Sequence, residues 1–156
     1  MSTGNRLLRT ENFLRYWLPA LTWAALVFLF SGGVFSAAQT GHILRPFLEW
    51  LLGEISDAHF ALIHFLVRKA AHLTVYATLS ALWFRALRGP RPGWNPSWAL
   101  WALLVGMLVA LGDELHQSFL PSRTGTPWDV LLDSVGALLA QAAIARFARR
   151  KTQSPV

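Results

Sequence analysis

Four long apolar runs, joined by short polar connections, constrain this chain more than any other feature. Their approximate bounds are 17–35, 60–84, 97–117 and 128–147. Each run is long enough for a helix that crosses the hydrocarbon core of a bilayer, which takes about 20 apolar residues. The 156-residue chain is 54% hydrophobic and only 14% charged, whereas soluble proteins are roughly 25% charged. We therefore predict an all-α integral membrane protein, folded as a four-helix bundle.

The polar connections divide the rest of the chain. Residues 1–15 form a basic N-terminus, 16–147 the predicted membrane domain, and 148–156 a polar tail. Between the first two runs, the segment 47–52 (FLEWLL) is too short to span a bilayer, so we expect an amphipathic segment lying in the membrane interface. The chain has no cysteine, which excludes disulfides and thiol chemistry.

Basic residues are distributed unevenly between the connections. With four spans, ten of the 14 Lys and Arg residues fall on the side of the two termini. Seven of the eight acids fall on the opposite side. The positive-inside rule therefore predicts that both termini are cytoplasmic. The net charge of +6 is explained by these short basic loops, so we expect no nucleic-acid partner.

The stretch from Asp113 to Asp133 is the most polar part of the apolar region. It contains four acids, one arginine, one histidine and one glutamine. Lys69, Asp113, Asp129 and Ser31 each lie 15 to 17 residues from the cytoplasmic end of their helix, roughly 22–25 Å at 1.5 Å per residue. Polar groups of all four predicted helices should therefore share one layer in the outer leaflet.

Sequence spacing predicts which polar side chains share a helix face. A stripe on the second helix comprises Lys69, His72, Tyr76 and Ser80, and the pairs at i, i+4 spacing are Asp113 with Gln117 and Asp129 with Asp133. Ionisable groups at this depth cost several kcal/mol unless they are paired or wetted. We therefore expect Lys69 to pair with Asp113 or Glu114. Small residues at the same spacing, Gly106/Ala110 and Gly136/Ala140, should let helices approach closely.

The polar motif resembles the VanZ-like family of bacterial integral membrane proteins. In order, the matching residues are Lys69, His72, Tyr76, Asp113, Glu114, Gln117, Phe119, Pro121, Arg123, Asp129 and Gly136. They cover about residues 66–140. The family usually has Asn in place of Asp133, so a charge there is a departure. The resemblance implies a multi-pass protein of the bacterial cytoplasmic membrane with a cell-envelope role. The family's founding role is low-level resistance to the glycopeptide teicoplanin, and the resemblance implies no defined reaction.

Two interpretations of the polar layer remain open. It is either a buried seam of ion pairs or a ligand site in which Lys69 and His72 clamp an anion and His72 serves as a general base. The candidate ligand-binding residues are Lys69, His72, Tyr76, Asp113, Glu114, Gln117, Arg123 and Asp129. No catalytic residue is assigned, but the candidates are His72, Asp113 and Glu114. Arg123 could form a loop ion pair with Asp129 or grip a phosphate or carboxylate in a bidentate manner.

Metal binding is the weaker expectation. Asp113 and Glu114 could hold a divalent cation together with Asp129 or Asp133, and a mixed histidine and carboxylate set could suit zinc. Neither arrangement has a recognised ligand spacing, so we expect no metal and no cofactor. The other histidines, His42, His59 and His64, are expected to be ordinary interface residues.

Two classes of function follow. The first is a binding or accessory protein that holds an anionic lipid or an envelope-precursor head group and changes how a drug or an enzyme reaches it. The second is a membrane enzyme acting on a lipid-linked phosphate or peptidoglycan precursor. A transporter is a weaker third class, because four helices leave little room for alternating access. We favour the first class because no nucleophile is paired with a base at a recognisable spacing. Membrane lipids are the expected partners.

Overall fold

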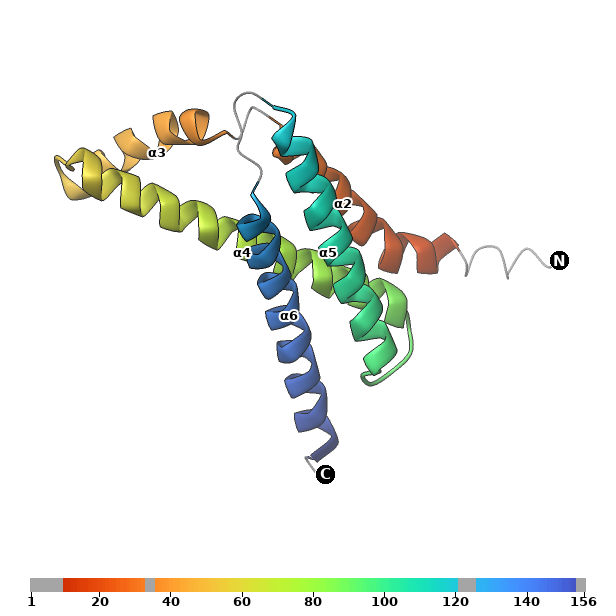
Figure 1. The fold of residues 1–156 in the computed structure, drawn as a ribbon. Helices are drawn as coiled ribbons and strands as arrows, with labels where there is room; N and C mark the ends of the chain where they lie inside the picture. The colour runs from red at the N-terminus through yellow and green to blue at the C-terminus, as the bar shows by residue number, and fades with distance from the viewer. Residues whose placement is uncertain (1–9, 33–35, 121–125, 154–156) are drawn as a thin grey trace.

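The structure is a computed structural model that describes residues 10–32, 36–120 and 126–153. These residues form helices, with no strand among them, so the all-α prediction is confirmed (Figure 1). A π-helical turn leads into the first of five α-helices. The elements are η1 (Phe13–Trp17), α2 (Leu18–Ser31), α3 (Ala37–Leu52), α4 (Asp57–Arg88), α5 (Pro96–Ser118) and α6 (Pro127–Gln153).

Local sequence signals explain where several helices begin and end. Ser36, Ser56 and Asn95 are the N-caps of α3, α4 and α5, and each side chain accepts a hydrogen bond from a backbone N–H in the first turn. Such caps satisfy donors that have no partner within the helix. Gly53 and Gly89 end α3 and α4 with φ of 81° and 58°, a conformation that glycine adopts without a Cβ penalty.

Helix length and composition fit a multi-pass membrane protein. Among the residues that the structure describes, three helices are long and apolar enough to cross a membrane, namely Thr10–Ser31, Pro96–Ser118 and Pro127–Arg150. The fourth predicted span is less regular. The helix α4 meets this standard only together with α3, at an angle of 115° between them. Its polar stripe, which includes Lys69 and His72, lowers its hydropathy. The four-span prediction thus corresponds to three clear spans and one bent pair.

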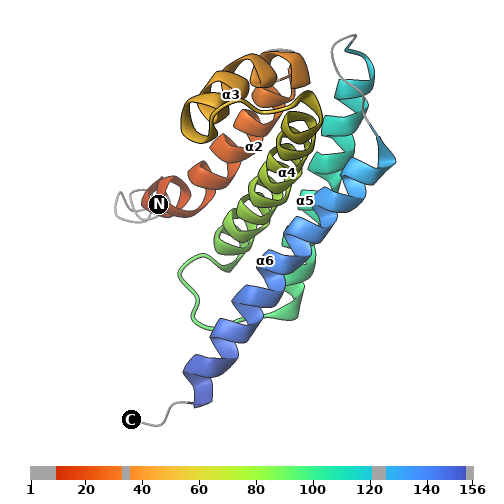
Figure 2. The same cartoon turned by 90° about the vertical axis from the view of Figure 1, so that its left-hand side faces the viewer.

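The helix α4 is the centre of the arrangement. It packs against α6, α5 and α2, and Figure 2 shows α4, α5 and α6 running side by side. The first half of α4 projects away from the other helices together with α3 (Figure 1). The predicted amphipathic segment 47–52 is the end of α3. Arg45 of α3 pairs with Glu49 of the same helix and with Asp57 at the start of α4. The second pair links α3 to α4.

Apolar side chains fill the core of the bundle and are also exposed on its outer surface. One core cluster joins Val27, Tyr76, Leu79 and Ala110 from α2, α4 and α5, and a second lies where α4 meets α5. Large apolar side chains are also exposed, including Leu29 at 70%, Ile43 at 77% and Trp50 at 79%. A soluble protein rarely exposes so many large apolar side chains. Lipid as the surrounding solvent explains it.

Candidate functional site

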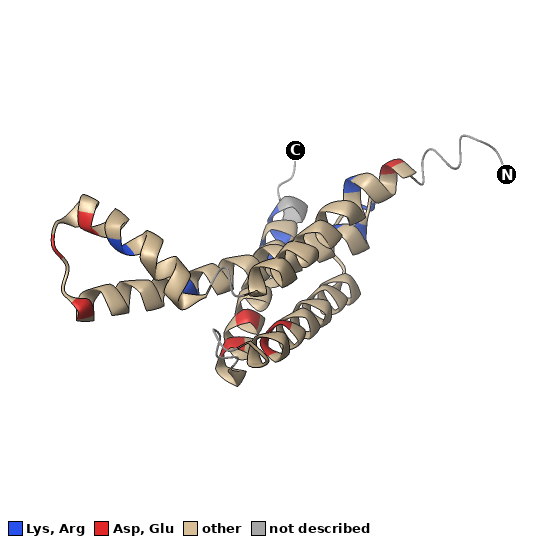
Figure 3. Cartoon of the chain, turned by 90° about the horizontal axis from the view of Figure 1, so that it is seen from above, with Lys and Arg blue, Asp and Glu red and all other residues tan. Residues whose placement is uncertain are grey.

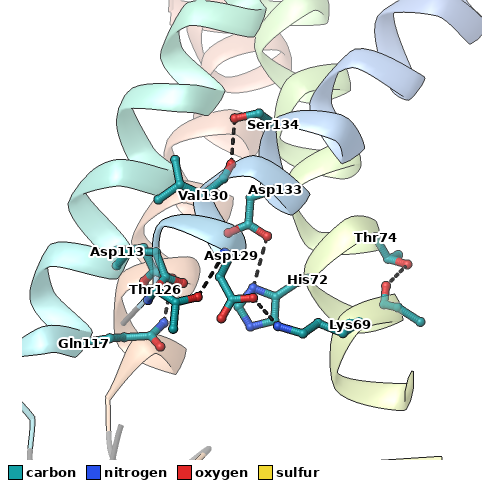
Figure 4. A network of polar contacts seen from close by, with 12 residues as sticks. Lys69, His72, Thr74, Asp113, Gln117, Thr126, Asp129, Val130, Asp133 and Ser134 are labelled. Atoms are coloured by element: carbon teal, nitrogen blue, oxygen red, sulfur yellow. Dashed lines mark hydrogen bonds and ion pairs between the residues drawn. The ribbon is translucent and has the colours of Figure 1, made fainter. Parts of the chain in front are cut away.

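Two contacts between charged or ionisable side chains join α4 to the first part of α6. The Lys69 ammonium pairs with Asp129 Oδ1, and His72 Nδ1 lies 3.1 Å from Asp133 Oδ1 (Figure 4). The expectation that Lys69 pairs with Asp113 or Glu114 is therefore wrong. The physical reason is that Lys69 faces α6, the helix most extensively packed against α4, while both α5 acids accept hydrogen bonds from other groups.

The two acids of α5 are buried beside this contact. Gln117 Nε2 donates to Asp113 Oδ2 at 2.9 Å, as the i, i+4 spacing predicts. The Thr126 backbone N–H donates to Glu114 Oε2 at 2.8 Å. Figure 3 shows one group of acids within the bundle, and further acids at the far end of the α3–α4 projection and near the N-terminus. Glu114 thus connects α5 to the residue that immediately precedes α6.

Side chains from three helices converge on one point. His72, Glu114 and Asp133 each offer a nitrogen or oxygen atom within 4.8 Å of the others. Asp133 is 0% exposed and Glu114 5%. We call the whole assembly the polar cluster. Its members are Lys69, His72, Tyr76, Asp113, Glu114, Gln117, Asp129 and Asp133.

Some buried oxygens of the polar cluster make no hydrogen bond within the described residues. They are the Tyr76 hydroxyl and one carboxylate oxygen each of Asp113, Glu114 and Asp133. Burial of a polar group without a partner costs about 1–3 kcal/mol. The unpaired oxygens of Glu114 and Asp133 are therefore candidates for contact with a bound group, whereas the Tyr76 hydroxyl lies next to the Asp113 carboxylate.

A cavity of about 500 Å³ borders the polar cluster, between α2, α3, α4 and α5. Its polar lining residues are Ser31, Thr40, His64, Arg68, His72, Tyr76, Asp113 and Gln117. Its walls are mostly apolar and include Phe30, Ile43, Phe47 and Val75. The cavity therefore combines an apolar channel with a small set of polar groups, which is the usual character of a small-molecule site.

Several polar contacts were missed by sequence reasoning. His64 lines the cavity, contacts Thr40 Oγ1 at 3.0 Å and stacks on Phe60, although it was expected to be an ordinary interface residue. Gln141 Nε2 donates to Ser80 Oγ at 2.8 Å. A signal for Gln141 existed, because it lies eight residues after Asp133 and thus on the same helix face.

A further missed contact joins α2 to α5. Ser31 Oγ and His116 Nδ1 are 3.2 Å apart. Ser31 was placed in the correct layer by its depth, but nothing in the sequence indicated that His116 would face it. A hydroxyl next to an imidazole is the minimum arrangement for an activated nucleophile.

The candidate ligand-binding residues meet in space, with one outside the described residues. Lys69, His72, Glu114 and Asp129 belong to contacts between helices. Tyr76, Asp113 and Gln117 line the cavity. Arg123 lies in residues 121–125, outside the part that the structure describes, so both of its suggested roles stay predictions. Asp133, whose role the sequence left open, is fully buried against His72.

The chain matches the family model described as VanZ/LLP1 over residues 16–148. No curated protein and no solved structure matches it. The match runs from η1 through most of α6 and contains the whole polar cluster and the residues that line the cavity. The predicted resemblance, which rested on the polar motif, is thus confirmed over most of the chain. The chain belongs to the VanZ/LLP1 family.

Proposed function

We propose that this VanZ/LLP1 protein has a cell-envelope role in the bacterial cytoplasmic membrane and binds an anionic lipid or a lipid-linked envelope precursor. The polar head group would lie at the polar cluster and the apolar chain along the cavity. The observation that carries the proposal is the cavity, whose mostly apolar walls also include polar-cluster residues such as His72, Asp113 and Gln117. An amphiphile has the same division into apolar and polar parts.

One cationic side chain of the cavity wall supports an anionic head group. Arg68 of α4 lines the cavity, and Asp113 lines it as well. An arginine can hold a phosphate or carboxylate in a bidentate manner. Binding of this kind would change how a drug or an enzyme reaches an envelope precursor. It would thereby connect the chain to the glycopeptide-resistance role that the resemblance implies.

Filling the cavity should weaken lipid binding. Ala71 is exposed on α4 and lines the cavity, so Ala71→Trp places an indole in the space proposed for the lipid chain. We expect affinity for a fluorescent polyprenyl phosphate to fall at least about tenfold, or 1.4 kcal/mol. The measurement is a binding titration on purified protein in mild detergent, with phosphatidylglycerol and phosphatidylcholine as the anionic and zwitterionic comparison lipids.

The neighbouring residue supplies a matched control. Ala70 is exposed on the same helix and is not among the described residues that line the cavity. Ala70→Trp adds the same side chain and should leave affinity unchanged. Equal binding by both variants, or equal affinity for anionic and zwitterionic lipids, would contradict the proposal.

A membrane enzyme is the second candidate function. The Ser31–His116 contact favours it, because Ser31 also lines the cavity and its hydroxyl lies next to a potential general base. In the binding titration with polyprenyl phosphate, an enzyme would release inorganic phosphate with turnover. A binding protein would return the lipid unchanged.

The proposed membrane orientation has a separate test. We propose that both termini are cytoplasmic, since Lys and Arg residues are concentrated on that side. The chain has no native cysteine, so Glu54→Cys and Pro92→Cys each introduce a single thiol at an exposed connection. An impermeant thiol reagent should label intact cells at position 54 but not at 92. Both should react once the membrane is permeabilised, and the reverse pattern in intact cells would invert the topology.

A further inference from the structure

We propose that the chain binds a divalent metal ion between His72, Glu114 and Asp133. These residues come from α4, α5 and α6, and their ligand atoms lie within 4.8 Å of one another. Ligand atoms around a zinc ion are about 3.4 Å apart, given metal–ligand distances of about 2.1 Å. Small side-chain rotations would therefore bring the three atoms into coordination range. The sequence predicted no metal because ligands from three helices form no recognisable spacing.

The unsatisfied oxygens of two proposed ligands point independently to a bound cation. Asp133 is completely buried, and while its Oδ1 contacts His72, its Oδ2 has no hydrogen-bond partner within the described residues. Glu114 is 5% exposed; its Oε2 accepts from Thr126, and its Oε1 has no partner there either. A carboxylate oxygen left unpaired in an apolar interior is costly. A coordinated metal would satisfy both oxygens at once.

A third carboxylate adds negative charge to this layer. Asp113, which precedes Glu114 on α5, is 3% exposed. Figure 4 draws Asp113, Asp129 and Asp133 in the same network of polar contacts. Since Lys69 is paired with Asp129, a dication would offset the negative charge that the remaining carboxylates bring to this layer.

The donor set indicates which metals to expect. One imidazole nitrogen and two carboxylate oxygens suit zinc and manganese, whereas magnesium favours carboxylates and water without nitrogen. Three protein ligands would leave at least one coordination position open. His72 also lines the cavity, which gives the open position a route to a bound molecule. The metal site does not depend on the proposed lipid binding.

Metal titration of the intact chain tests the inference. The purified, chelator-treated protein is titrated in detergent with Zn²⁺, Mn²⁺ and Mg²⁺ by calorimetry, and Co²⁺ is added separately to record its visible absorption bands. We expect saturable binding of about one Zn²⁺ or Mn²⁺ per chain, much weaker binding of Mg²⁺, and a rise in Tm on loading. Asp133→Asn and Glu114→Gln preserve side-chain shape and should each weaken binding at least tenfold.

The control variant replaces a different histidine on α4. His59→Gln lies outside the three proposed ligands and outside the cavity lining and should bind metal with unchanged affinity. If a ligand variant does not fold, the Co²⁺ spectrum and the Tm shift of the unaltered chain decide whether the metal site exists. The inference is overturned if the unaltered chain shows no saturable binding up to millimolar metal, or if folded ligand variants bind as it does. Neither result bears on lipid titrations made in the presence of chelator, which test the proposed function separately.

Discussion

Replacing Gly136 by alanine is expected to destabilise the bundle by about 3 kcal/mol, the upper part of the usual range for overpacking. A Cβ at this position would lie 2.5 Å from the Leu73 carbonyl oxygen and 3.1 Å from the Leu73 Cα. The obstacle is backbone, so α4 and α6 would have to move apart. Unfolding of the detergent-solubilised chain by sodium dodecyl sulfate measures the change.

Gly106 provides a matched control on α5. A Cβ there would lie 3.4 Å from the Ala137 Cβ, which is an ordinary contact distance. Alanine is favoured over glycine in a helix interior by about 1 kcal/mol, so Gly106→Ala should be neutral or stabilising. Both substitutions gain the same helix propensity. The difference between their changes in the free energy of unfolding therefore measures the cost of the clash at Gly136.

A second variant identifies which atoms oppose the new methyl group. Adding Leu73→Ala to Gly136→Ala removes the leucine side chain but leaves its backbone in place. The double variant should therefore gain no stability relative to Gly136→Ala. Full rescue would show that the side chain sets the helix spacing, contrary to the expected backbone contact.

The close helix approach at Gly136 also determines the geometry of the polar cluster. Leu73 follows His72 along α4, and Gly136 lies three residues after Asp133 on α6. A separation of the helices at this point would increase the 3.1 Å distance between His72 Nδ1 and Asp133 Oδ1. Close approach of the backbones is thus a condition for the site, and Gly136→Ala should also lose metal binding.

Much of this arrangement could be predicted from the sequence, because depth and helix face follow from fixed helical dimensions. At 1.5 Å and 100° per residue, Lys69 and His72 fall on one face, as do Asp129 and Asp133. Opposite charge then predicts that the α4 face meets acids, without saying which acids. Small residues predicted a close approach, and Gly136 against Leu73 confirms it.

The choice of partner could not be predicted in the same way. Lys69 has four acids at a similar depth, and periodicity does not say whether α5 or α6 faces it. Helix packing decides, since α4 packs most extensively on α6. The 115° angle between α3 and α4 also has no sequence period, because it depends on how the connection near Gly53 turns. The cavity and the role of His64 follow from that angle.

Breaking the Lys69–Asp129 pair should cost about 2 kcal/mol, between the values for exposed pairs and for fully buried ones. The Lys69 side chain is 31% exposed and that of Asp129 15%. Lys69→Met should cost more than Asp129→Leu. The long stem of an unpaired lysine can carry its charge toward water, whereas the short Asp129 side chain would remain among other carboxylates.

A double-mutant cycle in detergent measures the coupling directly. Lys69→Met combined with Asp129→Leu should cost clearly less than the two single changes together, whereas Lys69→Met with Asp113→Leu should be close to additive. Glu49→Gln on α3 removes a pair whose side chains are both 40% exposed and should cost only about 0–1 kcal/mol. Additive effects at Lys69 and Asp129, with strong coupling to Asp113, would instead place the ion pair between α4 and α5. Because the pair joins α4 to α6 beside His72 and Asp133, its loss should also weaken metal binding without removing a ligand.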